Sequence, residues 1–345
     1  TDGPATLADG GAYFSNFMAD GVSSTIFMLV FMAITYLVVA MGVNKGIEKA
    51  NLVMMPALIV VSAVLAIYSL TLPGAIEGLA FYLIPDVSKF SPELVISALG
   101  QTFFTLSLAM GIMVTYGSYL DKKEKLTSSV VQIAGTTFGI SLLAGFMIIP
   151  STFAALGSGD AVSGGTADAL NAGPSLMFII LPQVFNSMGD AGGIIGCVFF
   201  ILVIFAALTS SISLVETCTA IISDGAHMSR NKALAIVIVF TTVVGMIVNF
   251  GYSGLSFIQP LGEGTSILDF LDFLSNSVMM PIAAIMTCVF VGWIIKPKAI
   301  IDEVKISARF RAEKAWTVMI KYIAPVCIVL ILVAYVAQSL GIITL

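Results

Sequence analysis

Eight long apolar stretches constrain the fold of this chain more than any other feature of its sequence. They cover residues 25–43, 51–71, 97–120, 127–150, 191–222, 232–250, 267–295 and 316–340. A helix needs about 20 predominantly apolar residues to cross the hydrocarbon core of a bilayer, and every stretch is close to this length or longer. The sequence therefore predicts an all-α integral membrane protein with eight membrane-spanning helices.

The overall composition agrees with a surface that faces lipid. Of the 345 residues, 58% are hydrophobic and only 10% are charged, whereas a soluble domain has about 25% charged residues. So few charges cannot cover a water-facing surface. The net charge of −5 argues against nucleic acid as a partner, because no basic stripe exists to neutralise phosphates.

The basic residues predict the orientation of the spans. The loops after the first, third, fifth and seventh stretches hold 13 of the 15 Lys and Arg residues, while Lys89 lies in another loop and Lys321 inside the eighth stretch. Because basic loops stay on the cytoplasmic side, the chain is predicted to lie in the inner (plasma) membrane with both ends external. Its start has no signal-peptide pattern, so we expect an odd number of spans to precede residue 1.

The residues that usually perform chemistry are sparse and scattered. Four cysteines lie inside apolar runs without ligand spacing, and the one histidine, His227, lies in a short polar loop. An enzyme would need a nucleophile paired with a base, or a cluster of metal ligands. We therefore predict no catalytic residue, no enzymatic activity and no cofactor.

Two of the predicted external loops are long. The first covers residues 72–96 and the second covers residues 151–190. The second loop contains an apolar run, from Gly173 to Pro182, that is too short to cross a bilayer. This run is either a lid that dips into an external vestibule or a packed surface loop.

The third stretch carries polar side chains at its centre. It contains Gln101, Thr102, Thr105 and Ser107, followed by small residues up to Gly111. A helix can break at membrane depth only where protein covers the freed backbone or where the backbone lines a cavity. An unbroken helix, with hydroxyls bonded to the preceding turn, is the simpler explanation for this stretch alone.

The fifth stretch has a similar polar centre and an internal acid. Its hydroxyls belong to Thr209, Ser210, Ser211 and Ser213, and such hard oxygens suit a sodium ion as well as hydrogen bonds between helices. Glu216 follows inside the stretch, and an ionisable group there is a functional candidate by default. It could pair with a buried partner or serve as a cytoplasmic gate.

Several ordered motifs resemble the neurotransmitter:sodium symporter family, in its bacterial branch. They are Gly46-Ile47-Glu48-Lys49-Ala50-Asn51 with Met54-Met55-Pro56-Ala57, Leu72-Pro73-Gly74-Ala75 with Pro85-Asp86, Gln101 to Gly111 with Thr115-Tyr116-Gly117-Ser118-Tyr119, Gly173-Pro174 with Leu181-Pro182, and Leu208-Thr209-Ser210-Ser211. They occur in family order over nearly the whole chain, which makes the set specific although each motif alone is weak.

The resemblance implies an inverted-repeat fold of five plus five helices from which the first three helices are missing. The eight stretches would then be helices 4 to 11 of the family. The implied segments are an external loop (1–24), the last two helices of the first repeat (25–71), an external loop (72–96), the second repeat (97–295) with an external lid loop (151–190), a cytoplasmic loop (296–315) and a final helix (316–345).

The resemblance also implies roles for individual residues. Phe104, Ser107 and Met110 match substrate-binding positions. Sodium-site positions are Thr105, Thr137, Ala206 (by its carbonyl), Thr209 and Ser210. Chloride-site positions are Gln101, Thr105 and Ser141. Asp272 matches the acidic half of an external gate, whereas Asp269 has the ordinary explanation of an acid in a first helical turn.

Two positions depart from the family pattern. Thr137 stands where the family usually has Asn or Asp as a sodium ligand, which weakens the expectation of a first sodium site. Ser141 stands near a position at which bacterial members often have a carboxylate. Either chloride takes part, or an acid comes from a missing helix.

The predicted function is sodium-coupled symport of an amino acid or a related small amine by alternating access. Sodium, and chloride if it is used, would be coupling ions, and the lipid bilayer and a small-molecule substrate would be the partners. A channel or a non-transporting scaffold is the alternative, although the chain lacks the charged rings of a filter. An intramembrane enzyme is the third candidate.

Overall fold

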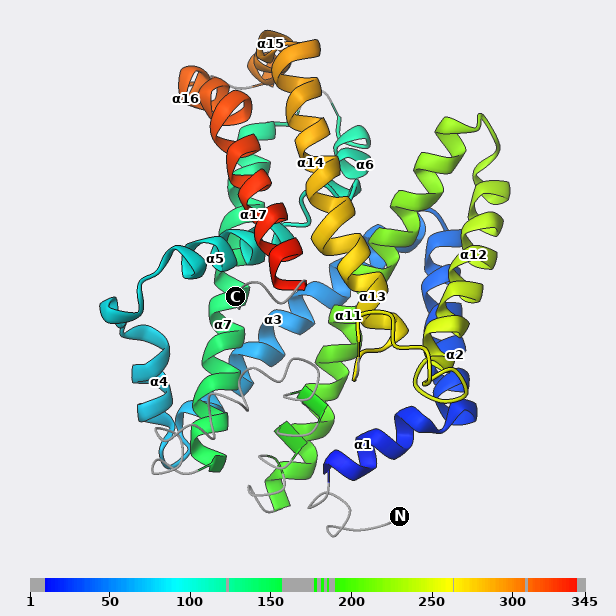
Figure 1. The fold of residues 1–345 in the computed structure, drawn as a ribbon, viewed down its shortest axis with the longest axis vertical. Coiled ribbons are helices and arrows are strands. Elements are labelled where there is room, and N and C mark those ends of the chain that lie inside the picture. The colour runs from blue at the N-terminus through cyan, green and yellow to red at the C-terminus, as the bar shows by residue number, and fades with distance from the viewer. Residues whose placement is uncertain are drawn as a thin grey trace. The chain divides into compact units, whose positions relative to one another are not determined.

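The computed structural model describes residues 10–121, 124–156, 177–178, 181–182, 185, 190–262, 264–307 and 310–339, and helices are the only regular secondary structure among them (Figure 1). It divides into two compact units, which we describe separately. The first comprises Thr1–Asp86, Gly139–Thr219 and Met228–Leu255, and the second comprises Val87–Phe138, Ala220–His227 and Ser256–Leu345.

The helices of the first half of the chain, in order, are α1 (Gly10–Ala19), α2 (Gly21–Ala40), the π-helical η1 (Val43–Ile47), α3 (Glu48–Leu70), α4 (Ala75–Leu83), the 3₁₀ turn η2 (Val87–Lys89), α5 (Pro92–Thr105), α6 (Ile112–Ser118) and α7 (Leu126–Leu156). The later ones are α11 (Asp190–Gly225), α12 (Arg230–Phe250), α13 (Ile267–Asp272), the π-helical η4 (Phe273–Met279), α14 (Met280–Val289), the π-helical η5 (Phe290–Ile294), α15 (Pro297–Ser307), α16 (Glu313–Val318), the π-helical η6 (Met319–Ile323) and α17 (Ala324–Ser339).

Seven helical segments of the described chain are long and apolar enough to cross a membrane. They are Gly21–Ala40, Glu48–Leu70, Leu126–Ala154, Gly192–Gly225, Arg230–Phe250, Ile267–Ile294 and Glu313–Ser339. They match seven of the eight predicted spans. The third predicted span does not form one helix, because it is divided between α5 and α6.

The first span begins earlier than predicted, because an aspartate caps its helix. Asp20 accepts hydrogen bonds from the backbone N–H of Val22 and of Ser23, at 3.1 and 3.4 Å, and α2 starts at the next residue, Gly21. The preceding residues Gly10–Ala19, predicted only as part of an external loop, form the helix α1. The Gly-rich sequence gave no periodic signal for that helix.

Helix α2 packs against α12 in the first unit through small residues and hydroxyl groups. The Tyr36 hydroxyl lies 2.7 Å from Thr241 Oγ1, and Asn249 Nδ2 donates to Thr25 Oγ1 at 2.8 Å. A Cβ on Gly245 would meet Met32 Cε at 3.0 Å. Such contacts are typical of helix pairs in lipid, where association depends on close packing and interhelical hydrogen bonds.

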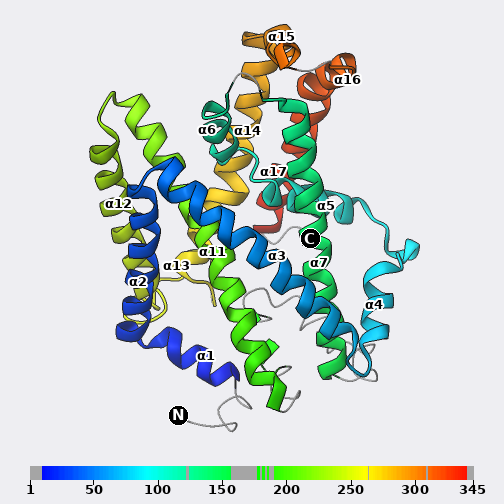
Figure 2. The ribbon, with the colours of Figure 1, turned by 180° about the vertical axis from the view of Figure 1, so that it is seen from behind.

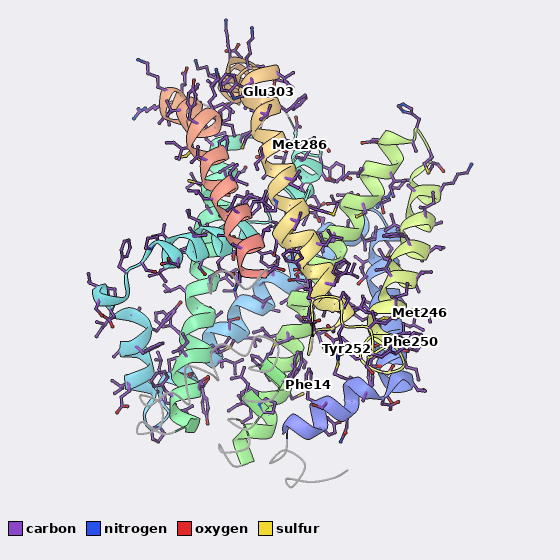
Figure 3. The ribbon with its side chains drawn as sticks, in the orientation of Figure 1. Phe14, Met246, Phe250, Tyr252, Met286 and Glu303 are labelled. Carbon is purple, nitrogen blue, oxygen red and sulfur yellow. The ribbon has the colours of Figure 1, made fainter. Side chains whose placement is uncertain are left out.

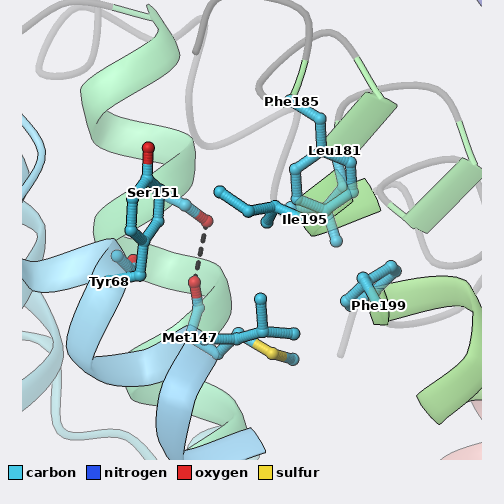
Figure 4. A pocket seen from close by; sticks show the side chains of 9 residues that line it. Tyr68, Met147, Ser151, Leu181, Phe185, Ile195 and Phe199 are labelled. Atoms are coloured by element: carbon cyan, nitrogen blue, oxygen red, sulfur yellow. Dashed lines mark hydrogen bonds between the residues drawn. The ribbon is translucent and has the colours of Figure 1, made fainter. Parts of the chain in front are cut away.

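Helices α3, α7 and α11 form the core of the first unit (Figure 2). The buried side chains of this core are Leu58, Leu65, Ala66, Met147, Leu181, Phe185, Phe199 and Leu202. A small cavity of about 20 Å³ lies among them (Figure 4). That volume is enough for about one water molecule.

The described part of the second long loop, which was predicted to be external, contributes to the lining of this cavity. Leu181 is 2% exposed and Phe185 is 9% exposed, and both line the cavity together with residues of α3, α7 and α11 (Figure 4). These two described residues of the loop therefore pack within their own unit. Its Gly173–Ser175 end lies outside the described residues.

The second unit is built around α5, α14 and α17. Buried Phe103, Met280, Ala284, Cys288 and Ile328 form its core. The opposite faces of these helices are apolar and exposed, as in Met286 of α14, which is 67% exposed (Figure 3). Exposed apolar faces of this kind suit a lipid environment.

Candidate functional site

The third span is interrupted between α5 and α6. Residues 106–111 are not helical, and φ is positive at Ser107 (52°), Ala109 (62°) and Gly111 (79°). Non-glycine residues rarely adopt positive φ, so two such residues and a glycine with positive φ within five positions mark a true break. The simpler hypothesis of an unbroken helix is therefore wrong.

The break leaves the end of α5 hydrogen-bonded in a compact turn. The backbone N–H groups of Leu106, Ser107 and Leu108 donate to the carbonyls of Thr102, Phe104 and Phe103, at 3.1, 2.9 and 3.2 Å. Irregular backbone at membrane depth persists only where protein covers it or where it lines a cavity. The carbonyl end of a half-helix carries partial negative charge and attracts cations.

A pocket of about 320 Å³ lies beside α5 in the second unit. Its lining residues come from α5, α13, η4, α14 and α17, and they are Gly100, Gln101, Phe103, Phe104, Asp272, Asn276, Ser277, Met280, Pro281, Ile331, Tyr335 and Gln338. Asp272 is the acid in this lining, and no Lys or Arg is among the lining residues. The pocket is therefore suited to a positively charged group.

Three predicted site residues thus come together, while two others do not. Gln101, Phe104 and Asp272 line the same pocket, whereas Ser107 and Met110 do not line it. Met110 instead packs against the core of the second unit. Gln101 Nε2 also donates to Thr105 Oγ1 at 3.4 Å, which places these two predicted positions in contact.

The sequence analysis missed four polar residues of the pocket. Asn276 donates to Asp272 Oδ1 at 2.5 Å, and its i+4 spacing from Asp272 was the signal for this contact. Ser277 lies beside it in the π-helical η4, and π-helical segments often occur at functional sites. Tyr335 and Gln338 are three residues apart on one face of the last helix, and this spacing was the available signal.

Asp269 has the ordinary role that was expected of it. Its carboxylate accepts from the Ser266 backbone N–H at 2.7 Å, and Ser266 Oγ accepts from the Asp269 N–H at 3.3 Å. This reciprocal pair is a capping box at the start of α13.

The predicted sodium ligands on α11 belong to the first unit. Thr209 is 6% exposed, and its hydroxyl donates to the Ala206 carbonyl at 2.9 Å, whereas Ser210 is exposed. One carbonyl and one hydroxyl oxygen therefore lie side by side, with a second hydroxyl on the next residue. Neutral oxygen donors of this kind fit a hard cation such as sodium.

Glu216, on the same helix, is buried and paired with an arginine that is 34% exposed. It is 0% exposed, and its two carboxylate oxygens accept from Nη1 and Nη2 of Arg230 on α12, each at 2.7 Å. Arg230 Nη2 also donates to the Val39 carbonyl at the end of α2, at 2.9 Å. The pair therefore joins three helices of the first unit.

The remaining predicted positions lie on α7. Thr137 is half-buried and Ser141 is exposed, one helical turn further along. Four residues apart, they share a helix face, as predicted. Their roles as ion ligands stay predictions.

A helical membrane protein with a span broken at its polar centre and ligand-type oxygens on another span is typical of secondary transporters. The comparison with known families agrees, since the Sodium:neurotransmitter symporter family matches residues 16–342. The chain belongs to this family.

Similar proteins come from bacteria and archaea. A sodium-dependent transporter of Bacillus subtilis is 35% identical over 93% of this chain and 68% of its own length, and one of Methanocaldococcus jannaschii is 34% identical over 92% and 61%. The crystal structure of MhsT in complex with L-phenylalanine has a TM-score of 0.79 at 36% identity, and the match covers 94% of this chain and 71% of MhsT. The chain thus spans about two thirds of these proteins.

Proposed function

We propose that the protein carries out sodium-coupled symport of an amino acid or related small amine across the plasma membrane. The observation that carries the proposal is the break at residues 106–111, beside a pocket that contains one acid and no base. The sodium dependence of the named relatives and the phenylalanine bound to MhsT support the same function.

In this proposal, α11 supplies sodium ligands. The Ala206 carbonyl and the Thr209 and Ser210 hydroxyls hold the ion, because together they offer three neutral oxygens to a hard cation. Thr105 and Thr137 hold a second sodium ion, and Gln101, Thr105 and Ser141 form the chloride site if chloride is used. Bound sodium stabilises one conformation of the transporter and so biases alternating access.

The broken span supplies the substrate site and the outer gate. Phe104 covers an amino acid whose side chain lies against Ser107 and Met110, and these residues suit an apolar or amphipathic side chain. Asp272 attracts a cationic group at the external side of the pocket. Movement of the helices then exposes substrate and sodium to the cytoplasm.

The experiment is uptake of a radiolabelled amino-acid panel by cells that express the complete gene, in sodium and in choline medium. We expect saturable uptake that is lost without sodium. Thr209→Ala and Ser210→Ala should each raise the sodium concentration for half-maximal uptake by roughly tenfold, about the 1.4 kcal/mol of one lost ligand. Ser211→Ala, which removes a neighbouring hydroxyl, is the matched control and should behave like the wild type.

Each alternative outcome has a clear meaning. Uptake that ignores sodium would reject the ion assignments, and non-saturating flux would favour a channel. If Ser211→Ala weakens the sodium response as much as Thr209→Ala and Ser210→Ala do, the assigned ligands on α11 are wrong.

A further inference from the structure

The segment that joins the last two spans is strongly basic. Residues 296–321 contain seven Lys and Arg residues against three acids, a net charge of +4 in a chain whose net charge is −5. Clusters of four to eight basic residues next to a membrane span are typical of sites that bind anionic lipid headgroups. The structure shows where in this segment the charge gathers.

A second pocket, of about 440 Å³, lies within this segment in the second unit. Its lining residues are Lys296, Pro297, Lys298, Ile301, Asp302, Lys305, Glu313 and Thr317. Lys305 Nζ forms an ion pair with Glu313 Oε1 at 2.7 Å. Apart from this pair, the lining contains two lysines, Lys296 and Lys298, and one acid, Asp302. The lining therefore keeps a net positive charge.

The backbone brings these two lysines to the end of a membrane span. Lys296 follows η5 with φ at 70°, and this left-handed residue turns the chain into α15. Helix α15 buries Ile301 and exposes Glu303 (Figure 3). The pocket therefore lies between a short surface helix and the ends of two spans.

An aromatic pair lies on the same two spans, three residues before Lys296 and five residues after Thr317. Trp293 and Tyr322 are 54% and 56% exposed, and their rings pack edge to face with centroids 6.0 Å apart. Lys321 Nζ lies 5.3 Å from the centroid of Trp293. Trp and Tyr are enriched where hydrocarbon meets headgroups, and lysines there direct their ammonium groups towards the headgroups.

We propose that the pocket binds the phosphate of an anionic phospholipid, such as phosphatidylglycerol, from the adjacent leaflet. Lys296 and Lys298 pair with the phosphate, and the acyl chains lie along the exposed faces of η5 and η6 below it. A lipid, rather than a soluble anion, fits because the spans that end at the charged pocket also carry the exposed aromatic side chains of Trp293 and Tyr322. This inference does not depend on the transport proposal.

The test is retention of lipid by the purified protein in native mass spectrometry, after incubation with phosphatidylglycerol or phosphatidylcholine of equal chain length. The wild type should retain the anionic lipid preferentially, and Lys296→Gln with Lys298→Gln should reduce its retention by roughly tenfold. Lys296→Arg with Lys298→Arg should restore it. Lys314→Gln removes one charge of the same segment outside the pocket lining and should retain the lipid like the wild type.

Three results would overturn the proposal. They are equal retention of the two lipids by the wild type, equal loss in Lys314→Gln and the double Gln variant, and displacement of the lipid by millimolar glycerol phosphate. The last result would show that a soluble phosphate occupies the pocket. Because the readout is lipid mass, a failure of sodium-dependent uptake would leave this result unaffected.

Discussion

At the scale of single residues, the Glu216–Arg230 pair is the most constrained polar contact among the described residues of the first unit. The carboxylate is fully buried and accepts two hydrogen bonds from one guanidinium, in the two-pronged geometry that makes such pairs strong. Removal of Arg230 would leave the buried carboxylate of Glu216 without this guanidinium, whereas removal of Glu216 would leave Arg230 34% exposed and still bonded to the Val39 carbonyl. Replacement of both partners by apolar groups would leave no such charge.

This contrast predicts a double-mutant cycle. Arg230→Met should lower stability by about 3–5 kcal/mol because it leaves the buried Glu216 carboxylate, Glu216→Leu should cost clearly less because Arg230 is 34% exposed, and the double variant should lie much closer to the wild type than Arg230→Met does. The measurement is thermal unfolding of the purified protein in detergent. Lys305→Met breaks the exposed pair with Glu313 and should change stability by no more than about 1 kcal/mol. If the stability loss of the double variant equals the sum of the losses in the two single variants, the two residues are not energetically coupled.

The Asp20 cap predicts a dependence of stability on pH. The hydroxyl of Ser23 and the backbone N–H groups of Val22 and Ser23 hold the pKa of this carboxyl below its ordinary value of 3.8. Because the folded pKa is depressed, the stabilisation is complete above pH 3.8 and is lost as the pH falls through the folded pKa. The Tm difference between the wild type and Asp20→Asn should therefore shrink as the pH falls from about 4 to about 2. A constant difference over that range would contradict the prediction.

At the scale of elements, α5 and α17 approach closely at a glycine. A Cβ on Gly100 would collide with the hydroxyl of Tyr335 and would meet its Cζ at 2.9 Å. Both residues line the pocket beside the broken span. The lack of a side chain at position 100 therefore leaves room for the phenol end of the Tyr335 side chain against the first half of that span.

This contact predicts a pair of variants that compensate each other. Gly100→Ala should lower stability by about 1–3 kcal/mol through overpacking, and a second change, Tyr335→Leu, should recover part of the loss. Gly117→Ala in α6, where a new Cβ meets nothing within 4 Å, should be neutral or stabilising, because Ala favours helix. The measurement is the unfolding temperature, in detergent, of the wild type and of these three variants. Equal losses in Gly100→Ala and Gly117→Ala would reject the packing explanation.

The elements also show which features the sequence could predict. Apolar length located the seven continuous spans, because the bilayer imposes that length on any sequence. It could not decide whether the third span breaks, because Thr and Ser hydroxyls bond equally well to the preceding turn of an intact helix. Leu106, Ala109 and Met110 are good helix formers, so the positive φ values at Ser107 and Ala109 arise from tertiary structure.

The candidate site, like the spans, was predicted only in part from the sequence. The resemblance placed Gln101, Phe104 and Asp272, which the pocket brings together. It gave no sign of Tyr335, because its place in the pocket depends on how α17 packs against Gly100. Local sequence patterns carry little information on such contacts between distant segments.

At the scale of the whole molecule, the order of spans and loops predicts a two-sided protein. The loops with most of the basic residues follow the first, third, fifth and seventh spans. If α5 and α6 cross the membrane together as one interrupted span, these loops share one side. If the interrupted span instead turned back, every loop after Tyr119 would change sides.

Labelling of single cysteines distinguishes these two arrangements. Cys197, Cys218, Cys288 and Cys327 are first replaced by Ala, and one cysteine is then introduced at Thr71, Ser229, Ser256 or Lys314. We expect a membrane-impermeant maleimide to label positions 71 and 256 in intact cells and positions 229 and 314 only after permeabilisation. If position 71 is labelled from outside while 256 is not, the third span does not cross. If all four positions exchange sides, the span count stands and only the predicted orientation is wrong, so the two properties are tested separately.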